Sequence, residues 1–170
     1  MNVKIIEREV LNPLAETDNI NIEINPIPEK IGTVCLLDNT KPGADIILNS
    51  IGENLNIKSS KIKKPAGAPA TEEQIQQAIQ GDLTILALGD CGSCTTWLIL
   101  DAIRLERQKK PTIVVCSDVF TPFARELAES YGAIDLKIVE VEHPLAGQTE
   151  DVILKKTQPV ILQIKKILNQ

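Results

Sequence analysis

The sequence has few aromatic residues and no excess of positive charge. Aromatic side chains make up 2% of the 170 residues, and the formal net charge is -5. Proteins that bind single-stranded nucleic acid stack bases on aromatic rings, and duplex-binding proteins neutralise phosphates with basic side chains. A basic cluster at Lys58–Lys64 is typical of a solvated edge strand whose lysines oppose aggregation. We therefore expect no nucleic-acid partner.

Long hydrophobic runs are also missing. Charged residues interrupt the apolar positions of Met1–Leu11, so this segment lacks the continuous apolar core of a signal peptide. No segment approaches the roughly 20 apolar residues that a membrane-spanning helix needs. We therefore expect a cytoplasmic protein that does not contact a membrane. In that compartment, four cysteines indicate catalysis, a metal site or burial rather than a disulfide framework.

Several familiar motifs are absent. The chain has neither the G-x-G-x-x-G pattern of dinucleotide-binding proteins nor a P-loop, so we expect no bound cofactor. A C-x-x-C pair is present, but no tryptophan precedes it, and Thr121-Pro122 opens a helix rather than forming a thioredoxin-type cis-proline turn. Zinc prefers two further ligands, usually from a second closely spaced pair, and none exists. We expect no metal unless Cys35, Cys116 and His143 converge on the first pair.

What the chain does contain is a regular alternation of strand and helix patterns. Short apolar runs typical of buried strands alternate with helical spacings and turn residues. The expected strands are Thr33–Leu37, Leu55–Ile62, Leu83–Leu88, Thr112–Cys116 and Leu136–Val141, and the expected helices are Ala44–Leu55, Thr71–Gln80, Thr95–Arg107 and Thr121–Tyr131. This order predicts a three-layer α/β/α fold with a mostly parallel sheet of four to five strands and helices on both faces.

The two ends of the chain have different patterns. Residues 1–31 predict an extended N-terminal arm, in which Asn19–Asn25 alternates polar and apolar residues as a half-buried strand does. Residues 32–170 predict a single α/β domain. Its tail, up to Gln170, predicts one or two helices, with Pro159 at the start of a helix or at a break.

Polar residues follow four of the predicted strands. In parallel sheets, ligands bind beyond the carboxyl ends of the strands, so these residues should share one rim. We expect this rim to bind a small-molecule substrate. The expected binding residues are Asp38, Asn39, Thr40, Gly92, Ser93, Thr95, Cys116, Ser117 and Asp118.

The C-x-x-C pair lies where a strand passes into a helix. The positive end of the helix dipole and the free N–H groups there favour a thiolate at Cys91. Cys94, inside the first turn, is positioned to resolve an adduct formed at Cys91. Asp90 either caps the helix or carries a proton, and His143, the only histidine, suits an acid/base role.

Together these segments resemble the UGSC family of (seleno)proteins. The resemblance rests on Gly89–Thr95, Lys110–Cys116, His143–Gly147 and Leu36–Asp45. More distantly, the order of motifs is similar to the selenoprotein B subunits of glycine, sarcosine, betaine and D-proline reductases. The resemblance implies that the position of Cys91 is often selenocysteine and that the chemistry is reductive and acts on a small molecule. Unlike those reductases, this shorter chain has Thr95-Thr96-Trp97 where a third cysteine often stands.

Two classes of function follow. The first is a thiol-dependent oxidoreductase in which Cys91 attacks, Cys94 resolves, and His143 and Asp90 move protons. Its electrons would come from an external thiol or a redox partner protein. The alternative is a non-catalytic binding or partner subunit whose cysteine pair holds a soft metal or a thiol ligand. Beyond these two classes, a third possibility is a structural subunit of a larger reductase that docks through its N-terminal arm and C-terminal helix. The arm lies either across the domain or on a neighbouring subunit of a homo-oligomer.

Overall fold

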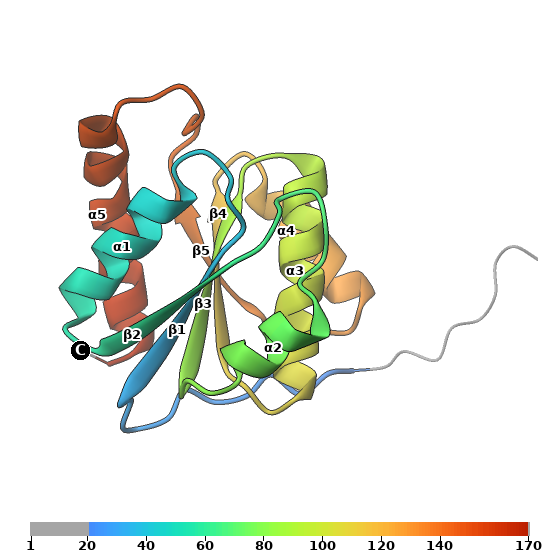
Figure 1. Cartoon of the computed structure of the whole chain (residues 1–170). Coiled ribbons are helices and arrows are strands. Elements are labelled where there is room, and N and C mark those ends of the chain that lie inside the picture. The colour runs from blue at the N-terminus through green and yellow to red at the C-terminus, as the bar shows by residue number, and fades with distance from the viewer. Residues whose placement is uncertain (1–20, 170) are drawn as a thin grey trace, which may run out of the picture.

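The computed structural model describes residues 21–169 and forms a five-stranded sheet covered by five helices (Figure 1). The strands are β1 (Thr33–Asp38), β2 (Lys58–Lys63), β3 (Leu83–Gly89), β4 (Thr112–Ser117) and β5 (Lys137–Val141). The helices are α1 (Ala44–Leu55), α2 (Glu72–Ala78), α3 (Gly92–Arg107), α4 (Thr121–Ser130) and α5 (Glu150–Ile167). The predicted fold class is confirmed.

The strands are ordered β2-β1-β3-β4-β5, and every neighbouring pair is parallel. Helices α1 and α5 cover one face of the sheet, and α2, α3 and α4 cover the other (Figure 1). The two helices that follow β1 and β3, which are adjacent strands, therefore lie on opposite faces. This divergence makes a switch point, a crevice at the carboxyl ends of two strands where ligands bind in such folds.

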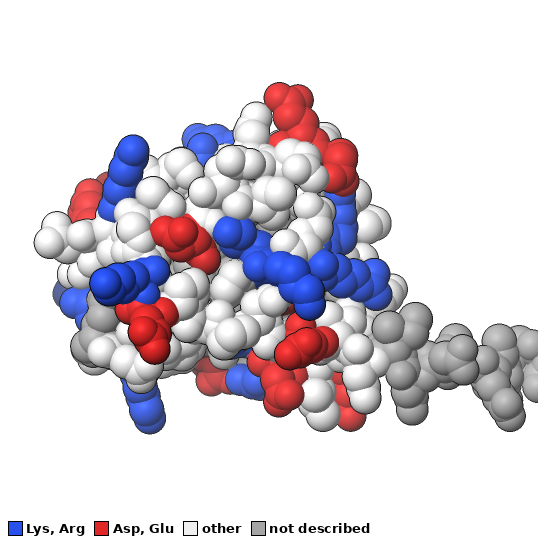
Figure 2. Space-filling view, turned by 90° about the horizontal axis from the view of Figure 1, so that it is seen from below, with Lys and Arg blue, Asp and Glu red and all other residues white. Residues whose placement is uncertain are grey.

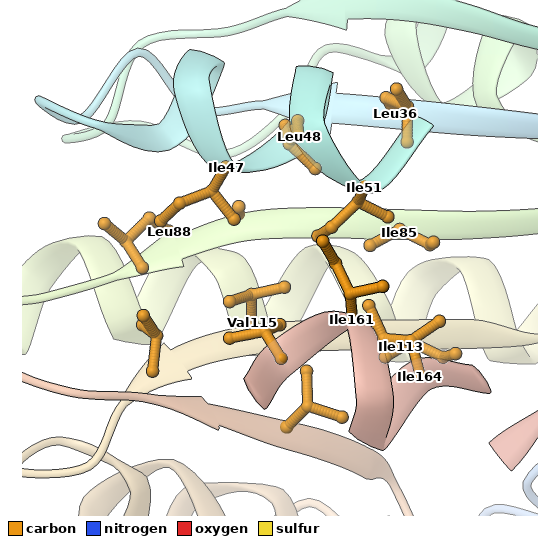
Figure 3. Packing of buried hydrophobic residues seen from close by; sticks show 14 of the residues in the cluster. Leu36, Ile47, Leu48, Ile51, Ile85, Leu88, Ile113, Val115, Ile161 and Ile164 are labelled. Atoms are coloured by element: carbon orange, nitrogen blue, oxygen red, sulfur yellow. The ribbon is translucent and has the colours of Figure 1, made fainter. Parts of the chain in front are cut away.

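The core that supports the sheet is aliphatic, as the scarcity of aromatic residues predicts. On the α1/α5 face, Ile51 of α1 lies close to Ile161 of α5 and Ile85 of β3, and Ile47 and Ile164 belong to the same cluster (Figure 3). All five of these side chains are buried. Interdigitated branched side chains pack at near-crystalline density, so the strand ends that carry the polar residues rest on a rigid base.

The tail of the chain differs from its prediction in one respect. Pro159 neither starts nor breaks a helix but lies inside α5, where it removes one backbone hydrogen bond. The helix continues because buried residues on both sides of the proline, from Ile153 to Ile164, form one apolar stripe against the sheet and α1. Tertiary burial here outweighs the local preference of proline.

Only part of the predicted arm lies within the described residues. Met1–Ile20, including the start of the predicted strand at Asn19–Asn25, lies outside them. Residues 21–25 form no strand; Ile22 N–H donates one bond to the Gly132 carbonyl at 2.7 Å. Asn25 is buried, and its side-chain amide donates to the Glu106 carboxylate at 2.6 Å. These two contacts attach the segment before β1 to the domain.

The basic cluster is also more varied than a solvated strand. β2 is an edge strand, and most of its side chains are exposed, as expected. Lys64, directly after it, is 2% exposed. The end of the molecule at which the strands begin lies opposite the rim formed by their carboxyl ends. Its surface carries lysine and arginine side chains interspersed with acidic ones (Figure 2).

Candidate active site

Cys91 is the N-cap of α3. Its backbone is extended, and its sulfur accepts the N–H of Cys94 at 3.3 Å. The Ser93 hydroxyl lies 3.8 Å from the same sulfur. A side-chain acceptor at the N-cap satisfies one of the N–H groups that the first helical turn leaves without an intrahelical partner. In this chain the acceptor is a thiol, so the helix terminus directly favours its ionised form.

The four cysteines fall into two groups by exposure. Cys91 is partly exposed, whereas Cys35, Cys94 and Cys116 are buried, and none is in a disulfide. Burial raises the pKa of the Cys35 thiol, and it raises the pKa of Cys116 to about 12. Only a partly exposed thiol is in a position to meet a solute, so the reactive candidate is Cys91.

The pKa values of Cys91 and Cys94 move in opposite directions. Partial burial acts to raise the pKa of Cys91, but hydrogen bonds from the Cys94 thiol and N–H and from Ser93, together with the Lys41 charge, lower it overall. Burial, followed by the interaction with Cys91, raises the pKa of Cys94. The Cys94 sulfur accepts Asp90 N–H and donates to the Cys91 carbonyl, both at 3.3 Å. The pair therefore consists of one thiol whose pKa is lowered and one whose pKa is raised.

Asp90 and His143 come together from the ends of β3 and β5. His143 Nδ1 lies 2.8 Å from Asp90 Oδ1, and the Asp90 side chain is 2% exposed. Because a carboxylate only accepts hydrogen bonds, Nδ1 donates and Nε2 is left for other partners. Cys91 caps α3, so Asp90 does not take that role.

His143 is held from two further directions. Its backbone N–H donates to Asp118 Oδ1 at 3.0 Å, and the same oxygen accepts Val119 N–H at 2.8 Å. The Phe120 ring meets the imidazole edge-on, with centroids 6.2 Å apart. Asp118 is predicted to contact substrate, and its Oδ1 accepts both of these backbone N–H groups, of His143 and Val119, within the protein.

The turn after β1 is internally bonded. Asp38 Oδ1 accepts Thr40 N–H at 2.7 Å, and Thr40 Oγ1 donates to the Lys64 carbonyl at 3.1 Å. Asn39 is fully buried; its amide pairs with the N–H and carbonyl of Leu88 at 2.7 and 2.9 Å. Asn39 therefore fastens the end of β1 to β3, and Thr40 links the same turn to the residue after β2. Lys41, in the same turn, was not among the predicted site residues. Its charge lowers the pKa of Cys91.

The residues beneath the cysteine pair are closely packed. Cys116 Sγ donates to the Gly89 carbonyl at 3.2 Å and lies 4.0 Å from Thr95 Oγ1. A Cβ at Gly89 would stand 2.6 Å from that sulfur, whereas a Cβ at Gly92 would meet open space. Gly89 is therefore required by packing, and Gly92 faces the open side of the site. Among the described residues, Ser117 Oγ is the buried side-chain oxygen without a hydrogen-bond partner.

The structure does not gather a metal site. Cys35 pairs in register with Thr84, the second residue of β3, so it lies well below the rim and does not converge on the cysteine pair. Within residues 21–169, no group of three or more Cys, His, Asp or Glu side chains is arranged to hold a metal ion. In the same residues, no helix combines the length and the apolar composition needed to cross a bilayer.

The sequence patterns did not predict a buried ion pair between Lys64 and Asp101. The Lys64 ammonium lies 2.9 Å from Asp101 Oδ2, and both side chains are fully buried. The Asp101 carboxylate also accepts Ala70 N–H at 3.0 Å, which ties the loop after β2 to α3. Lys64 looks like its exposed neighbours in the sequence, so only its burial distinguishes it.

The strand order and the cysteine pair at the switch point define a flavodoxin-like α/β protein with a thiol site. The chain belongs to the UGSC family: the model of that family matches residues 9–170. The more distant likeness to the selenoprotein B subunits stays a prediction.

Two solved structures are similar to this chain. A flavo di-iron protein mutant from Thermotoga maritima is 16% identical over 85% of this chain and 36% of that chain, with a TM-score of 0.51. A short-chain flavodoxin associated with a non-canonical PDU bacterial microcompartment is 13% identical over 81% of this chain and 97% of that chain, with a TM-score of 0.44. Among curated proteins, none matches the sequence significantly.

Proposed function

We propose that the protein is a thiol-dependent oxidoreductase that reduces a small molecule through Cys91 and Cys94. The observation that carries this proposal is the contrast within the pair. Cys91 is partly exposed and has a lowered pKa, whereas Cys94 is buried and has a raised pKa. A nucleophilic thiolate next to a protonated resolving thiol is the arrangement that thiol–disulfide exchange uses.

The simplest balanced reaction is the reduction of a small disulfide. The Cys91 thiolate attacks one sulfur, a Cys91–substrate disulfide forms, and the first substrate thiolate leaves. Cys94 then loses its proton and attacks Cys91 Sγ, which releases the second substrate thiolate and forms a Cys91–Cys94 disulfide. The substrate gains two electrons from the pair and two protons, one from Cys94 and one from solvent. An external dithiol restores the pair by accepting the disulfide bond.

The Asp90–His143 pair supports the proton transfers. Asp90 occupies Nδ1 of the imidazole at 2.8 Å and fixes the ring, which leaves Nε2 as the nitrogen that can accept a proton. In this role His143 takes the proton that Cys94 loses and gives it to the departing thiolate. Because the Asp90 side chain is 2% exposed, water does not compete with the imidazole for its carboxylate.

A flavin fits this site less well than a small-molecule substrate of the thiols does. Flavodoxins, which have this kind of fold, bind FMN at the equivalent switch point. A phosphate there needs free backbone N–H groups in the turn after β1. In this chain, Asn39, Thr40 and Lys41 N–H already donate to Ala87 O, Asp38 Oδ1 and Asn39 Oδ1. The buried Asp38 carboxylate would also repel an anion in this turn.

The proposal is tested by trapping the mixed disulfide that Cys91 forms with a small disulfide. Full-length protein with Cys94→Ser is mixed with 5,5′-dithiobis(2-nitrobenzoate), and the adduct is located by mass spectrometry. We expect a stable mixed disulfide on Cys91, whereas the unsubstituted protein passes on to an internal Cys91–Cys94 disulfide with release of two thiolates. Cys91→Ser is the matched control and should release none rapidly. Equal labelling of Cys91 and an ordinary free thiol at neutral pH would remove the basis of the proposal.

A further inference from the structure

A groove lies on the outer side of α3, away from the cysteine pair. Its cavity volume is about 540 Å³, compared with about 210 to 270 Å³ for other hollows in the described part of the chain. The segment 69–70 forms one side of it. The groove is otherwise lined by Trp97, Leu100, Ile103, Arg104, Arg107 and Tyr131. A volume of several hundred Å³ is the range that small-molecule sites occupy.

The groove collects the amphipathic aromatic residues of the chain. The sequence contains one tryptophan and one tyrosine, and both line this cavity. Leu100 lies half-buried on α3, three residues after Trp97, and Ile103 of the same helix is 2% exposed, whereas Tyr131 comes from the end of α4. Aromatic and aliphatic walls of this kind favour a flat apolar group.

The charge of the groove is opposite to that of the whole protein. The chain carries a net charge of -5, yet the lining includes two arginines and no acidic residue. Arg104 is occupied, because it bonds Asp101 at 3.2 Å and Glu72 at 3.1 Å. Arg107 is exposed, and within residues 21–169 its guanidinium makes no ion pair or hydrogen bond. A cation at one end of an apolar groove is left to pair with a ligand.

We infer that this groove is a binding site for a small organic anion with a flat apolar body. The body lies against Trp97 and Leu100, and the anionic group pairs with Arg107. Trp97 follows Cys91 by six residues, about 9 Å along the helix axis, so the site shares α3 with the cysteine pair but not its open rim. The inference does not depend on the proposed thiol chemistry.

The single tryptophan makes the test direct. Full-length protein is titrated with 1-anilinonaphthalene-8-sulfonate, and energy transfer from Trp97 is recorded. We expect saturation at one probe per chain and competition by 2-naphthoate. Arg107→Ala should weaken binding about fivefold, the upper range for a solvent-exposed ion pair. Leu100→Glu should abolish binding, since it places a carboxylate in the groove, and Lys166→Ala, an exposed cation on α5, should leave it unchanged.

Two further results test whether the negative charge of the ligand pairs with Arg107. The uncharged analogue N-phenyl-1-naphthylamine should bind more weakly than the sulfonate, and only the sulfonate should lose affinity in Arg107→Ala. Circular dichroism checks that each variant is folded. No saturable binding, or binding that is equal in the Arg107 and Lys166 variants, overturns the inference. The trapping of Cys91 is a separate measurement, so either idea can fail alone.

Discussion

His143 Nδ1 and Asp90 Oδ1, 53 positions apart in the sequence, lie 2.8 Å from each other at the rim of the sheet. The contact exists because β3 and β5 flank β4 in a parallel sheet, so their carboxyl ends reach the same edge. It places an oriented imidazole at the edge where Cys91 caps α3.

The orientation of His143 can be observed directly, because it is the only histidine. We expect the neutral imidazole to carry its proton on Nδ1, since Asp90 accepts there. Nitrogen-15 NMR distinguishes this tautomer from the Nε2–H form. Asp90→Ala should remove the preference. An Nε2–H tautomer in the unsubstituted protein would contradict the proposed role of Nε2 as an acceptor.

Asp118 is expected to position His143, in addition to its predicted role in binding substrate. Its Oδ1 accepts the N–H groups of His143 and Val119, so Asp118→Ala should shift the His143 NMR signals and increase the exchange of its backbone amide. Asp118→Asn retains an oxygen at the same place and should restore both. If Asn behaves like Ala, the negative charge and not the hydrogen bond is what matters.

The alkylation of Cys91 should depend on pH in a defined way. Because its pKa is lowered, the rate with iodoacetamide should reach half its maximum at a lower pH than for N-acetylcysteine. The Lys41 charge contributes to this, so Lys41→Gln should move the midpoint upward, and Lys63→Gln, an exposed lysine on β2, should not. The Cys94 midpoint, measured in Cys91→Ser, should lie above that of Cys91.

Two glycines of the motif should respond differently to alanine. A Cβ at Gly89 would lie 2.6 Å from Cys116 Sγ, so Gly89→Ala should destabilise the fold by about 1–3 kcal/mol in urea unfolding. Gly92→Ala, where a Cβ meets nothing within 4 Å, is the control and should change stability little. The double variant Gly89→Ala Cys116→Ala should recover part of the loss, and no recovery would locate the clash elsewhere.

Lys64 should be required for stability although it follows a run of exposed lysines. Lys64→Met removes the ammonium partner of the buried Asp101 carboxylate but leaves Arg104 beside it, so the loss should be about 1–3 kcal/mol. Lys63→Met, one position earlier and exposed, should fall within about 0.5 kcal/mol of the unsubstituted protein. Urea unfolding of both variants measures the difference. Equal effects would mean that the ion pair does not support the fold.

Much of the architecture was predictable because the local patterns agree with the global fold. The helix at Ala44–Leu55 was predicted with its observed bounds, since a strict apolar stripe coincides with the turn before it. The strands were predicted within one or two residues, except β2, whose start at Lys58 falls three residues after the predicted one. Pro159 and the chain before β1 were harder, because burial against distant elements decided them and local propensity did not.

For the candidate site, the sequence predicted which residues take part but not which residues they contact. A C-x-x-C between a strand and a helix marks Cys91 and Cys94 through local physics alone, because the helix terminus acts on neighbouring residues. The sequence by itself therefore determined the sheet, its reactive turn and the cysteine to examine. Only the tertiary structure decided that Asp90 pairs with His143, that Asn39 fastens β1 to β3, and that Lys64 is buried. Those relationships depend on which strand ends become neighbours, and strand order is set by packing across the whole sheet rather than by any one segment.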